Sequence, residues 1–182
     1  PNRAKEVLRA LRQEVAQPPI AIGVFADTNV REVNDLARDL GLNWVQLNGN
    51  ETVDYCSALN IPYIKAMKLP SDTALEVAVS QVEEVTIEYD PEVATILVEP
   101  LVEGYYGGAG VRLDLDLAVA LTRGYRLVVA GGLTPENVAE TVRRAHPWGV
   151  DVSSGVETDG VKDTGKIRSF IEAVRCVEHL TF

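Results

Sequence analysis

Residues 125–157, YRLVVAGGLTPENVAETVRRAHPWGVDVSSGVE, form the stretch that determines the fold, because their pattern is strand, glycine turn, helix, strand and glycine turn. Residues 127–130 are a short apolar run, typical of a strand buried on both faces of a parallel sheet, and a glycine pair ends it. Residues 149–153 predict a second buried strand, in which Asp151 is the one charge. The pattern indicates a βαβ unit.

The segment between these strands predicts a helix. Thr134 suits the N-cap, Pro135 suits the first helical position, and Pro147 ends the helix. Apolar side chains recur on one helical face: Val138, Val142 and Ala145.

Glycine turns follow both strands, at Gly131 and Gly132 and again at Ser154 and Gly155. Such turns expose unpaired backbone N–H groups, and a glycine has no Cβ to keep a phosphate away. The loops after strands 7 and 8 of a (β/α)8 barrel are where a phosphate usually lies. Two such turns favour a phosphate site over glycines that serve only as tight turns.

The composition predicts one globular domain over residues 1–182, with 46% hydrophobic and 24% charged residues. No apolar run reaches the roughly 20 residues of a membrane span and no signal peptide is evident, so we expect a cytoplasmic protein without a membrane partner. The net charge of −10 argues against nucleic acid as a partner. Cys56 and Cys176 have no metal-ligand spacing and are expected to be packing residues.

The rest of the chain alternates helix and strand. Helices are expected at residues 1–15, 30–40, 51–59, 71–82, 114–122 and 167–177. Strands are expected at residues 20–25, 44–47, 62–68 and 95–98, whereas residues 85–92 show no clear pattern. A helix followed by six strand–helix pairs predicts a parallel α/β sheet, either doubly wound or a barrel. The sequence has no G-x-G-x-x-G motif after an early strand, so the nucleotide-binding doubly wound form has no support. Six strand–helix pairs are two fewer than a (β/α)8 barrel contains.

Five segments resemble the phosphoribosylanthranilate isomerase family of tryptophan biosynthesis. They are VQLNGNE (45–51), YIKAMKL (63–69), YYGGAG (105–110), AGGLTPENV (130–138) and GVDVSSGVE (149–157). The resemblance implies a parallel (β/α)8 TIM barrel whose first strand, first helix and second strand are not in the sequence.

The resemblance also implies the reaction, an Amadori rearrangement of N-(5-phosphoribosyl)anthranilate. A general acid opens the ribose ring and a general base removes the proton from C2, so two titratable groups suffice. The family needs neither metal nor organic cofactor. The implied partner is a small phosphosugar, and the implied assembly is a monomer or a homodimer.

The resemblance places the general acid at Glu99, where the family has Asp. A solvated loop carboxylate is the alternative interpretation. The family's base is a Cys on its first strand, which is expected upstream of Pro1 because neither Cys56 nor Cys176 matches it.

The other site residues are also implied by resemblance. The phosphate-binding residues are Gly131, Gly132, Ser154, Gly155 and Val156, and the substrate-binding residues are Asp151, Gln46 and Gly108. A structural hydrogen-bond acceptor is an equally favoured interpretation of Asp151.

The roles of several polar and aromatic residues stay open. Asn48 stands where the family usually has His, and Val111 stands where Lys is frequent. Arg112 could replace that cation, although a surface ion pair is the favoured interpretation. Two tyrosines could stack on the anthranilate ring or pack their loop: Tyr105 and Tyr106. Two histidines receive no catalytic role, the first because it suits a helix C-terminus: His146 and His179.

Three other functions remain open at this point. One is another phosphate-sugar barrel isomerase, including one of dual tryptophan and histidine specificity. A ribulose-phosphate epimerase would need metal ligands, which the sequence does not suggest. A noncatalytic phosphate-binding remnant is favoured only if the base-bearing strand is truly absent.

Overall fold

The structure, a computed structural model, describes residues 2–70, 73–88, 94–102 and 110–178. The chain divides into two compact units, residues 1–66 with 88–94 and residues 67–87 with 95–182. The single domain expected over residues 1–182 stays a prediction. Within the described ranges, no helix combines the length and apolar character that a membrane crossing requires.

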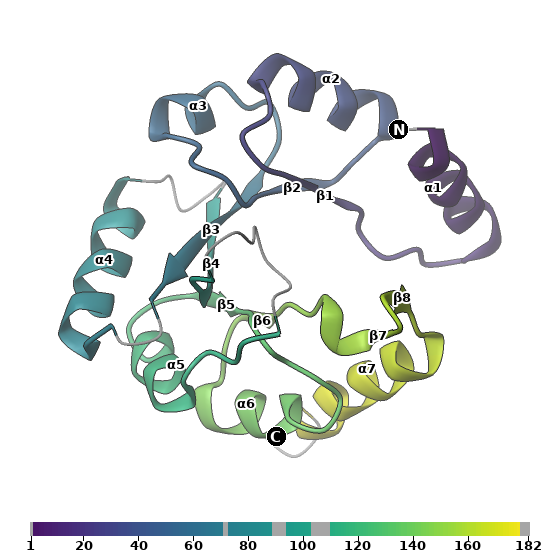
Figure 1. The fold of residues 1–182 in the computed structure, drawn as a ribbon. Coiled ribbons are helices and arrows are strands. Elements are labelled where there is room, and N and C mark those ends of the chain that lie inside the picture. Colours follow the sequence, from purple (N-terminus) through teal and green to yellow (C-terminus); the bar gives the residue numbers. More distant parts are fainter. Residues whose placement is uncertain (1, 71–72, 89–93, 103–109, 179–182) are drawn as a thin grey trace. The chain divides into compact units, whose positions relative to one another are not determined.

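The first unit alternates helices and parallel strands (Figure 1). Its elements are α1 (Asn2–Glu14), β1 (Ile22–Phe25), α2 (Val30–Leu40), β2 (Trp44–Leu47), α3 (Val53–Ser57) and β3 (Tyr63–Leu69), whose end continues into the second unit. Each strand pairs in parallel with the next one along the chain, Gly23 with Val45 and Val45 with Tyr63. The carboxyl ends of these strands therefore lie at one edge.

Helix α2 begins and ends at the residues that the sequence predicts. Asn29 lies at its N-cap and accepts a hydrogen bond from the Arg31 N–H group. Gly41 ends the helix with a φ of 61°, a left-handed conformation that glycine adopts without strain.

Helix α1 differs from the prediction in its burial. Its apolar side chains recur on one helical face, at Val7, Leu8 and Leu11, yet no residue of α1 is buried. The exposed fractions of Val7 and Val15 are 58% and 41%. In β1, Val24 is likewise 63% exposed. Apolar periodicity identifies the face that packing would bury but not what covers it.

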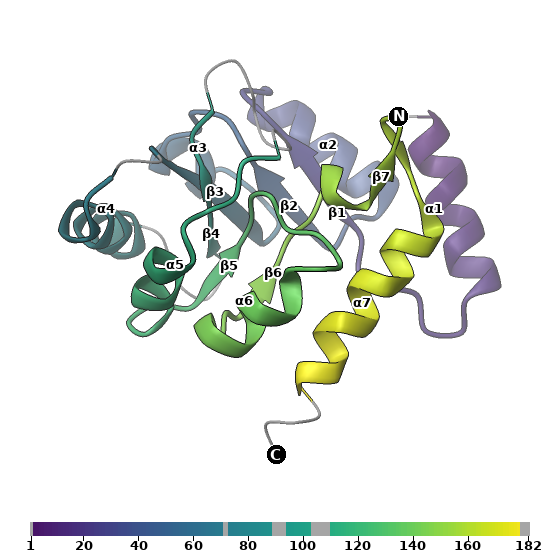
Figure 2. The same ribbon diagram turned by 60° about the horizontal axis from the view of Figure 1, so that its bottom comes forward.

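The second unit contains the end of β3 and a further series of strands and helices (Figure 2). Its first two elements are α4 (Leu75–Glu88) and β4 (Ala94–Pro100), although Glu88 and Ala94 themselves belong to the first unit. They are followed by α5 (Leu115–Thr122), β5 (Leu127–Val129), α6 (Val138–Ala145) and β6 (Gly149–Val150). The last elements are the 3-10 helix η1 (Ser154–Val156), the hairpin strands β7 (Glu157–Thr158) and β8 (Val161–Lys162), and α7 (Thr164–Glu178). Strands β4, β5 and β6 pair in parallel in chain order, with α6 packed between α5 and α7. The alternation and parallel pairing confirm the predicted fold class.

Several element boundaries in this unit were predicted wrongly. Helix α4 continues to Glu88 and so includes part of the segment that showed no clear pattern, whereas residues 71–72 and 89–93 lie outside the described residues. Strand β6 is only two residues long. Residues 157–162, for which the sequence predicted neither helix nor strand, form the hairpin of β7 and β8, whose turn residues Asp159 and Gly160 both have positive φ.

A hydrophobic core lies behind the two glycine turns. Leu133 from the turn after β5, Val138 from α6, Val156 from η1 and Phe170 from α7 form one buried cluster. Each glycine turn therefore contributes an apolar residue to the same core. Burial of these side chains fixes the turns relative to one another.

The helix after the first glycine turn begins at Val138, not at Pro135. Thr134 nevertheless accepts a hydrogen bond from the Glu136 N–H group, at 3.3 Å. Asn137 clamps the turn, because its Oδ1 accepts from the Thr134 N–H group and its Nδ2 donates to the Gly132 carbonyl oxygen, both at 2.9 Å.

We predict that Asn137→Ala lowers the free energy of unfolding by about 1–3 kcal/mol, since it leaves partly buried backbone groups without partners. Urea unfolding measures this loss. Arg143→Ala, an exposed change on the same helix, should alter stability by less than about 0.5 kcal/mol. Equal losses in the two variants would show that the clamp contributes nothing.

Candidate active site

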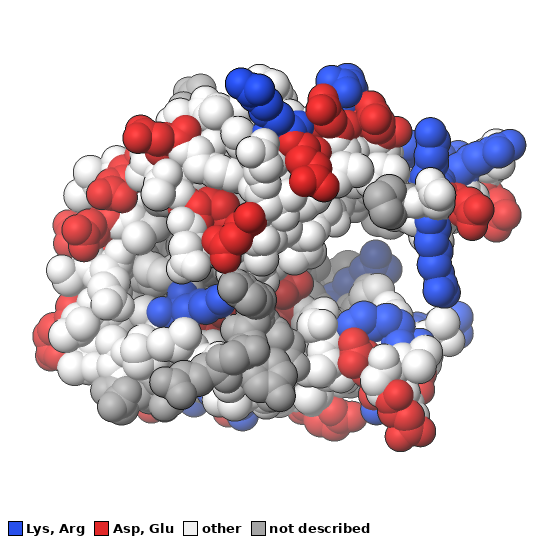
Figure 3. Space-filling view, turned by 45° about the horizontal axis from the view of Figure 1, so that its top comes forward, with Lys and Arg blue, Asp and Glu red and all other residues white. Residues whose placement is uncertain are grey.

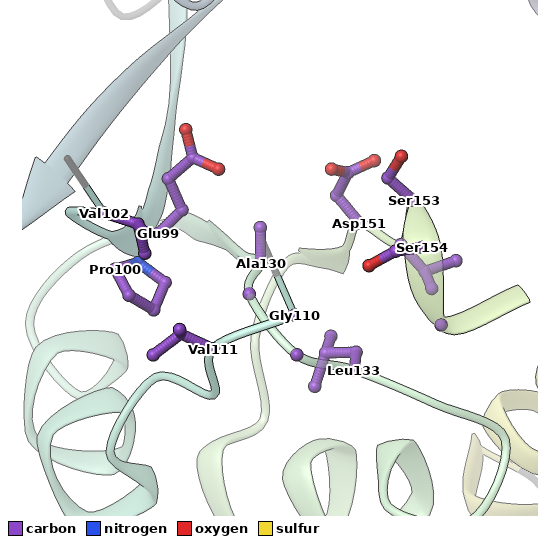
Figure 4. A pocket seen from close by; sticks show the side chains of 14 residues that line it. Glu99, Pro100, Val102, Gly110, Val111, Ala130, Leu133, Asp151, Ser153 and Ser154 are labelled. Carbon is purple, nitrogen blue, oxygen red and sulfur yellow. The ribbon is translucent and has the colours of Figure 1, made fainter. Parts of the chain in front are cut away.

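A pocket in the second unit lies at the carboxyl ends of β4, β5 and β6 (Figure 4). Each strand contributes the residues at its end or in the turn that follows. The lining consists of Glu99, Pro100, Val102, Gly110, Val111, Ala130, Gly131, Gly132, Leu133, Asp151, Val152, Ser153, Ser154 and Gly155. The structure thus brings together Glu99, Asp151 and both predicted glycine turns.

Glycine is required in the turn after β5. Gly131 and Gly132 have φ angles of 94° and 58°, in the left-handed region that disfavours other residues. A Cβ on Gly131 would overlap the ring of Pro100, and one on Gly132 would lie 2.7 Å from the backbone of Arg112. These glycines allow the turn to approach two other backbone segments closely.

Gly155 joins the two turns directly. A Cβ at this position would overlap the carbonyl oxygen of Leu133, so the backbone of the second turn lies against the backbone of the first. Val156 lies behind the pocket, and its N–H group donates to the Ser153 carbonyl oxygen at 3.3 Å. Among the predicted phosphate residues, Val156 therefore has the weakest geometric support.

Glu99 is buried, with 6% of its surface exposed. Its Oε1 has no hydrogen-bond partner among the described residues. Burial raises the pKa of this carboxyl group; the positive charge of Lys68 opposes the rise and the Asp151 carboxylate adds to it. Glu99 therefore stays protonated to a higher pH than an exposed glutamate and is not a solvated loop carboxylate.

Asp151 is the second carboxyl group of the pocket. Figure 4 shows it and Glu99 on either side of Ala130, with both carboxyl groups directed to the same side of the view. Burial raises the pKa of Asp151, and the charge of Lys162 opposes this rise. No lysine or arginine is found among the pocket-lining residues that the structure describes.

The remaining predicted site residues are not among the described residues that line this pocket. Gln46 is a buried residue of β2, in the first unit, where its Nε2 donates to Asn48 Oδ1 at 3.1 Å. Gly108, Tyr105 and Tyr106 lie outside the described residues, as does His179.

Four residues with open or minor roles now have defined surroundings. Arg112 makes a half-exposed ion pair with Glu140 at 3.3 Å, which agrees with the favoured interpretation. His146 ends α6 in the left-handed conformation. Cys56 is buried, and burial raises the pKa of its thiol to about 11. Cys176 is exposed, so its assignment as a packing residue was wrong.

A buried ion pair in the first unit joins residues that the sequence did not mark as functional. Lys65 Nζ lies 3.0 Å from Glu51 Oε2 and donates to the Gly49 carbonyl oxygen at 2.6 Å. Glu51 Oε1 in turn accepts from the Asp27 N–H group at 2.9 Å. The available signal was the presence of Lys65 and Lys68 within an otherwise apolar strand, because a buried ammonium group requires a partner.

Lys162 in β8 was also missed. Its Nζ donates to the Ser153 carbonyl oxygen at 2.9 Å and lies 2.6 Å from Glu157 Oε1. The sequence gives no indication of this contact, because the hairpin that places Lys162 was not predicted. Over the described residues, no group of three or more His, Cys, Asp and Glu side chains could hold a metal ion.

Comparisons with known proteins identify the family of this chain. The family model described as N-(5'phosphoribosyl)anthranilate (PRA) isomerase matches residues 2–173. The N-(5'-phosphoribosyl)anthranilate isomerase of Roseiflexus castenholzii is 48% identical over 155 residues, which cover 85% of this chain and 69% of the relative.

Solved structures of the same kind are similar to this chain. The phosphoribosyl anthranilate isomerase of Thermotoga maritima superposes with a TM-score of 0.74 at 31% identity, covering 94% of this chain and 80% of that one. A phosphoribosyl anthranilate isomerase in complex with reduced 1-(o-carboxyphenylamino)-1-deoxyribulose 5-phosphate gives a TM-score of 0.70 at 30% identity, covering 94% and 79%. The chain belongs to the N-(5'-phosphoribosyl)anthranilate isomerase family.

Proposed function

We propose that this chain isomerises N-(5'-phosphoribosyl)anthranilate in tryptophan biosynthesis, with Glu99 as general acid and the turns after β5 and β6 as the phosphate cradle. One observation carries the proposal. In a chain of this family, the buried Glu99 has an oxygen without a hydrogen-bond partner among the described residues and lines the same pocket as both glycine turns.

Backbone groups supply the phosphate site. Gly131, Gly132, Ser154 and Gly155 line one end of the pocket, where the turns can present N–H donors without Cβ atoms in the way. With a net charge of −10, the protein as a whole does not attract anions. Local N–H donors therefore have to provide the affinity for phosphate.

Glu99 performs the first step. Its carboxyl proton goes to the ribose ring oxygen, the bond between that oxygen and C1 breaks, and the nitrogen lone pair forms the C1–N double bond of a Schiff base. Burial raises the pKa of Glu99, so its proton stays available to a higher pH than that of an exposed glutamate, which suits a general acid.

A base then removes the proton from C2. The C–H electron pair forms a C1–C2 double bond and the iminium nitrogen accepts the displaced pair, so no external oxidant is needed. The enolamine tautomerises to the aminoketose. Neither Cys56 nor Cys176 lines the pocket, and a thiol with a pKa of about 11 is protonated at neutral pH. The family resemblance assigns this step to a cysteine upstream of Pro1.

Asp151 is suited to hold the substrate amine. Asp151 directly follows β6 and lies across the pocket from Glu99. A carboxylate in this position can accept a hydrogen bond from the amine N–H group. Together with the cradle it would fix both ends of the reacting carbon chain. Gln46 and Gly108 remain proposed substrate contacts.

A small phosphosugar is the proposed partner. On the face shown in Figure 3, Lys and Arg side chains are scattered among Asp and Glu side chains and do not form one basic patch. Together with the acidic composition, this supports the prediction that nucleic acid is not a partner. Cytoplasmic location, and assembly as a monomer or a homodimer, also stay predictions.

Glu99→Gln should lower kcat by about 100-fold or more, because the amide cannot donate a proton to the ring oxygen. Binding of inorganic phosphate should be unchanged, since Glu99 does not belong to the cradle. Turnover is measured by the fluorescence loss of the substrate. Glu99→Asp, the acid that the family uses, is the control and should keep most of the activity. A Glu99→Gln protein with normal kcat would exclude Glu99 from the mechanism.

The stability of Glu99→Gln relative to the wild type should depend on pH. Folding raises the pKa of Glu99, so this group favours the folded state below its unfolded pKa and loses that contribution as pH rises through the folded pKa. The melting temperature of Glu99→Gln relative to the wild type should therefore increase from about pH 5 to about pH 8. A difference that stays constant across this range would mean that Glu99 is not desolvated.

Gly155→Ala should weaken phosphate binding by about tenfold or more, because the new methyl group pushes the second turn away from Leu133 and an ~1 Å displacement has large effects at such sites. Calorimetric titration with inorganic phosphate measures the change. Gly124→Ala is the matched control, since nothing lies within 4 Å of a Cβ at that position. Equal affinity in the two variants would contradict a cradle built by contact between the turns.

A further inference from the structure

Lys162 contacts the backbone of the second phosphate turn from outside the pocket. Its Nζ donates to the Ser153 carbonyl oxygen at 2.9 Å and lies 3.4 Å from Ser153 Oγ. It also lies 2.6 Å from Glu157 Oε1, whose side chain is 24% exposed against 52% for Lys162. Lys162 does not line the pocket, whereas Ser153 and Ser154 do.

The geometry of one peptide connects this contact to the pocket. The described peptide bonds contain no cis form, so the N–H group of Ser154 points in the opposite direction to the carbonyl of Ser153. That carbonyl also accepts the Val156 N–H group, at 3.3 Å. Two donors therefore fix the carbonyl of this peptide on one side, and its N–H group is directed away from Lys162.

We propose that Lys162 is a positioning residue for the phosphate site: its ammonium group orients and polarises the Ser153–Ser154 peptide, so that the Ser154 N–H group becomes a stronger donor to the substrate phosphate. The inference rests on the proposed function, because it requires the phosphate to bind at this turn. The Lys162 ammonium group would thus support phosphate binding indirectly, in a pocket whose described lining has no lysine or arginine.

Electrostatics favour this arrangement. A hydrogen bond from a charged donor polarises its acceptor more than a neutral one does, and hydrogen bonds in a chain strengthen one another. The ion pair with Glu157 holds the ammonium group in place. The charge acts through a single peptide unit and does not require Lys162 to leave Glu157.

Lys166 provides a matched comparison. Its Nζ donates to the Glu157 carbonyl oxygen at 2.6 Å, so it too is a lysine bonded to the backbone in this part of the chain. Glu157, however, does not line the pocket. Removing Lys166 deletes the same charge near the site without changing the peptide that carries the Ser154 N–H group.

The test compares Lys162→Met, Lys162→Gln and Lys166→Met with the wild type. Calorimetric titration gives the Kd for inorganic phosphate, steady-state kinetics give KM and kcat, and thermal scans report folding. Lys162→Met should raise the phosphate Kd and the substrate KM on the order of tenfold, the size expected for a charged hydrogen bond. We expect kcat and the melting temperature to be little changed, Lys162→Gln to be intermediate, and Lys166→Met to bind within about twofold of the wild type.

Two results would overturn the inference alone. One is an equal phosphate Kd in the wild type and in Lys162→Met, measured on a wild type that does bind phosphate. The other is an equal loss in Lys162→Met and Lys166→Met, which would show a general charge effect. If Lys162→Met does not fold, Lys162→Gln decides, because wild-type affinity in this neutral variant would exclude the role of the charge. A wild type that does not bind phosphate would overturn the proposed cradle as well.

Discussion

The contact between Gly155 and the carbonyl oxygen of Leu133 is the constraint on which the site depends. It brings the turns after β5 and β6 together, so that donors from two strands can act on one anion. The contact requires both the absence of a Cβ and a common core behind the turns, in which Leu133 and Val156 are buried with Phe170. The proposed phosphate cradle and the packing behind it therefore depend on the same few residues.

The buried carboxyl groups of Glu99 and Asp151 are electrostatically unfavourable in this packed region. Each is desolvated, and burial raises the pKa of both, so an ionised pair is unfavourable. Two cations limit this effect from different sides, Lys68 acting on Glu99 and Lys162 on Asp151. Such an arrangement favours one protonated acid beside one ionised acceptor, which suits their proposed roles of proton donor and amine ligand.

The sequence predicted the turns and their strands because their causes are local: apolar runs, glycines and caps such as Asn29 act within a few residues. It did not predict the exposure of Val7 or Cys176, because periodicity does not report what covers a face. The pairing of Lys65 with Glu51 and the contact of Lys162 with Ser153 depend on folding that joins separate elements. The glycine turns were thus predictable from the sequence, but the residues that hold them were not.

The substitution of Glu for the family's Asp at position 99 must be accommodated by the side chain itself. Pro100, the next residue, lies where a Cβ on Gly131 would be, so the end of β4 is fixed against the turn after β5. The backbone cannot retreat to compensate for the added methylene without breaking that contact. The torsion angles of Glu99 therefore set the position of its carboxyl group, whose Oε1 has no hydrogen-bond partner among the described residues.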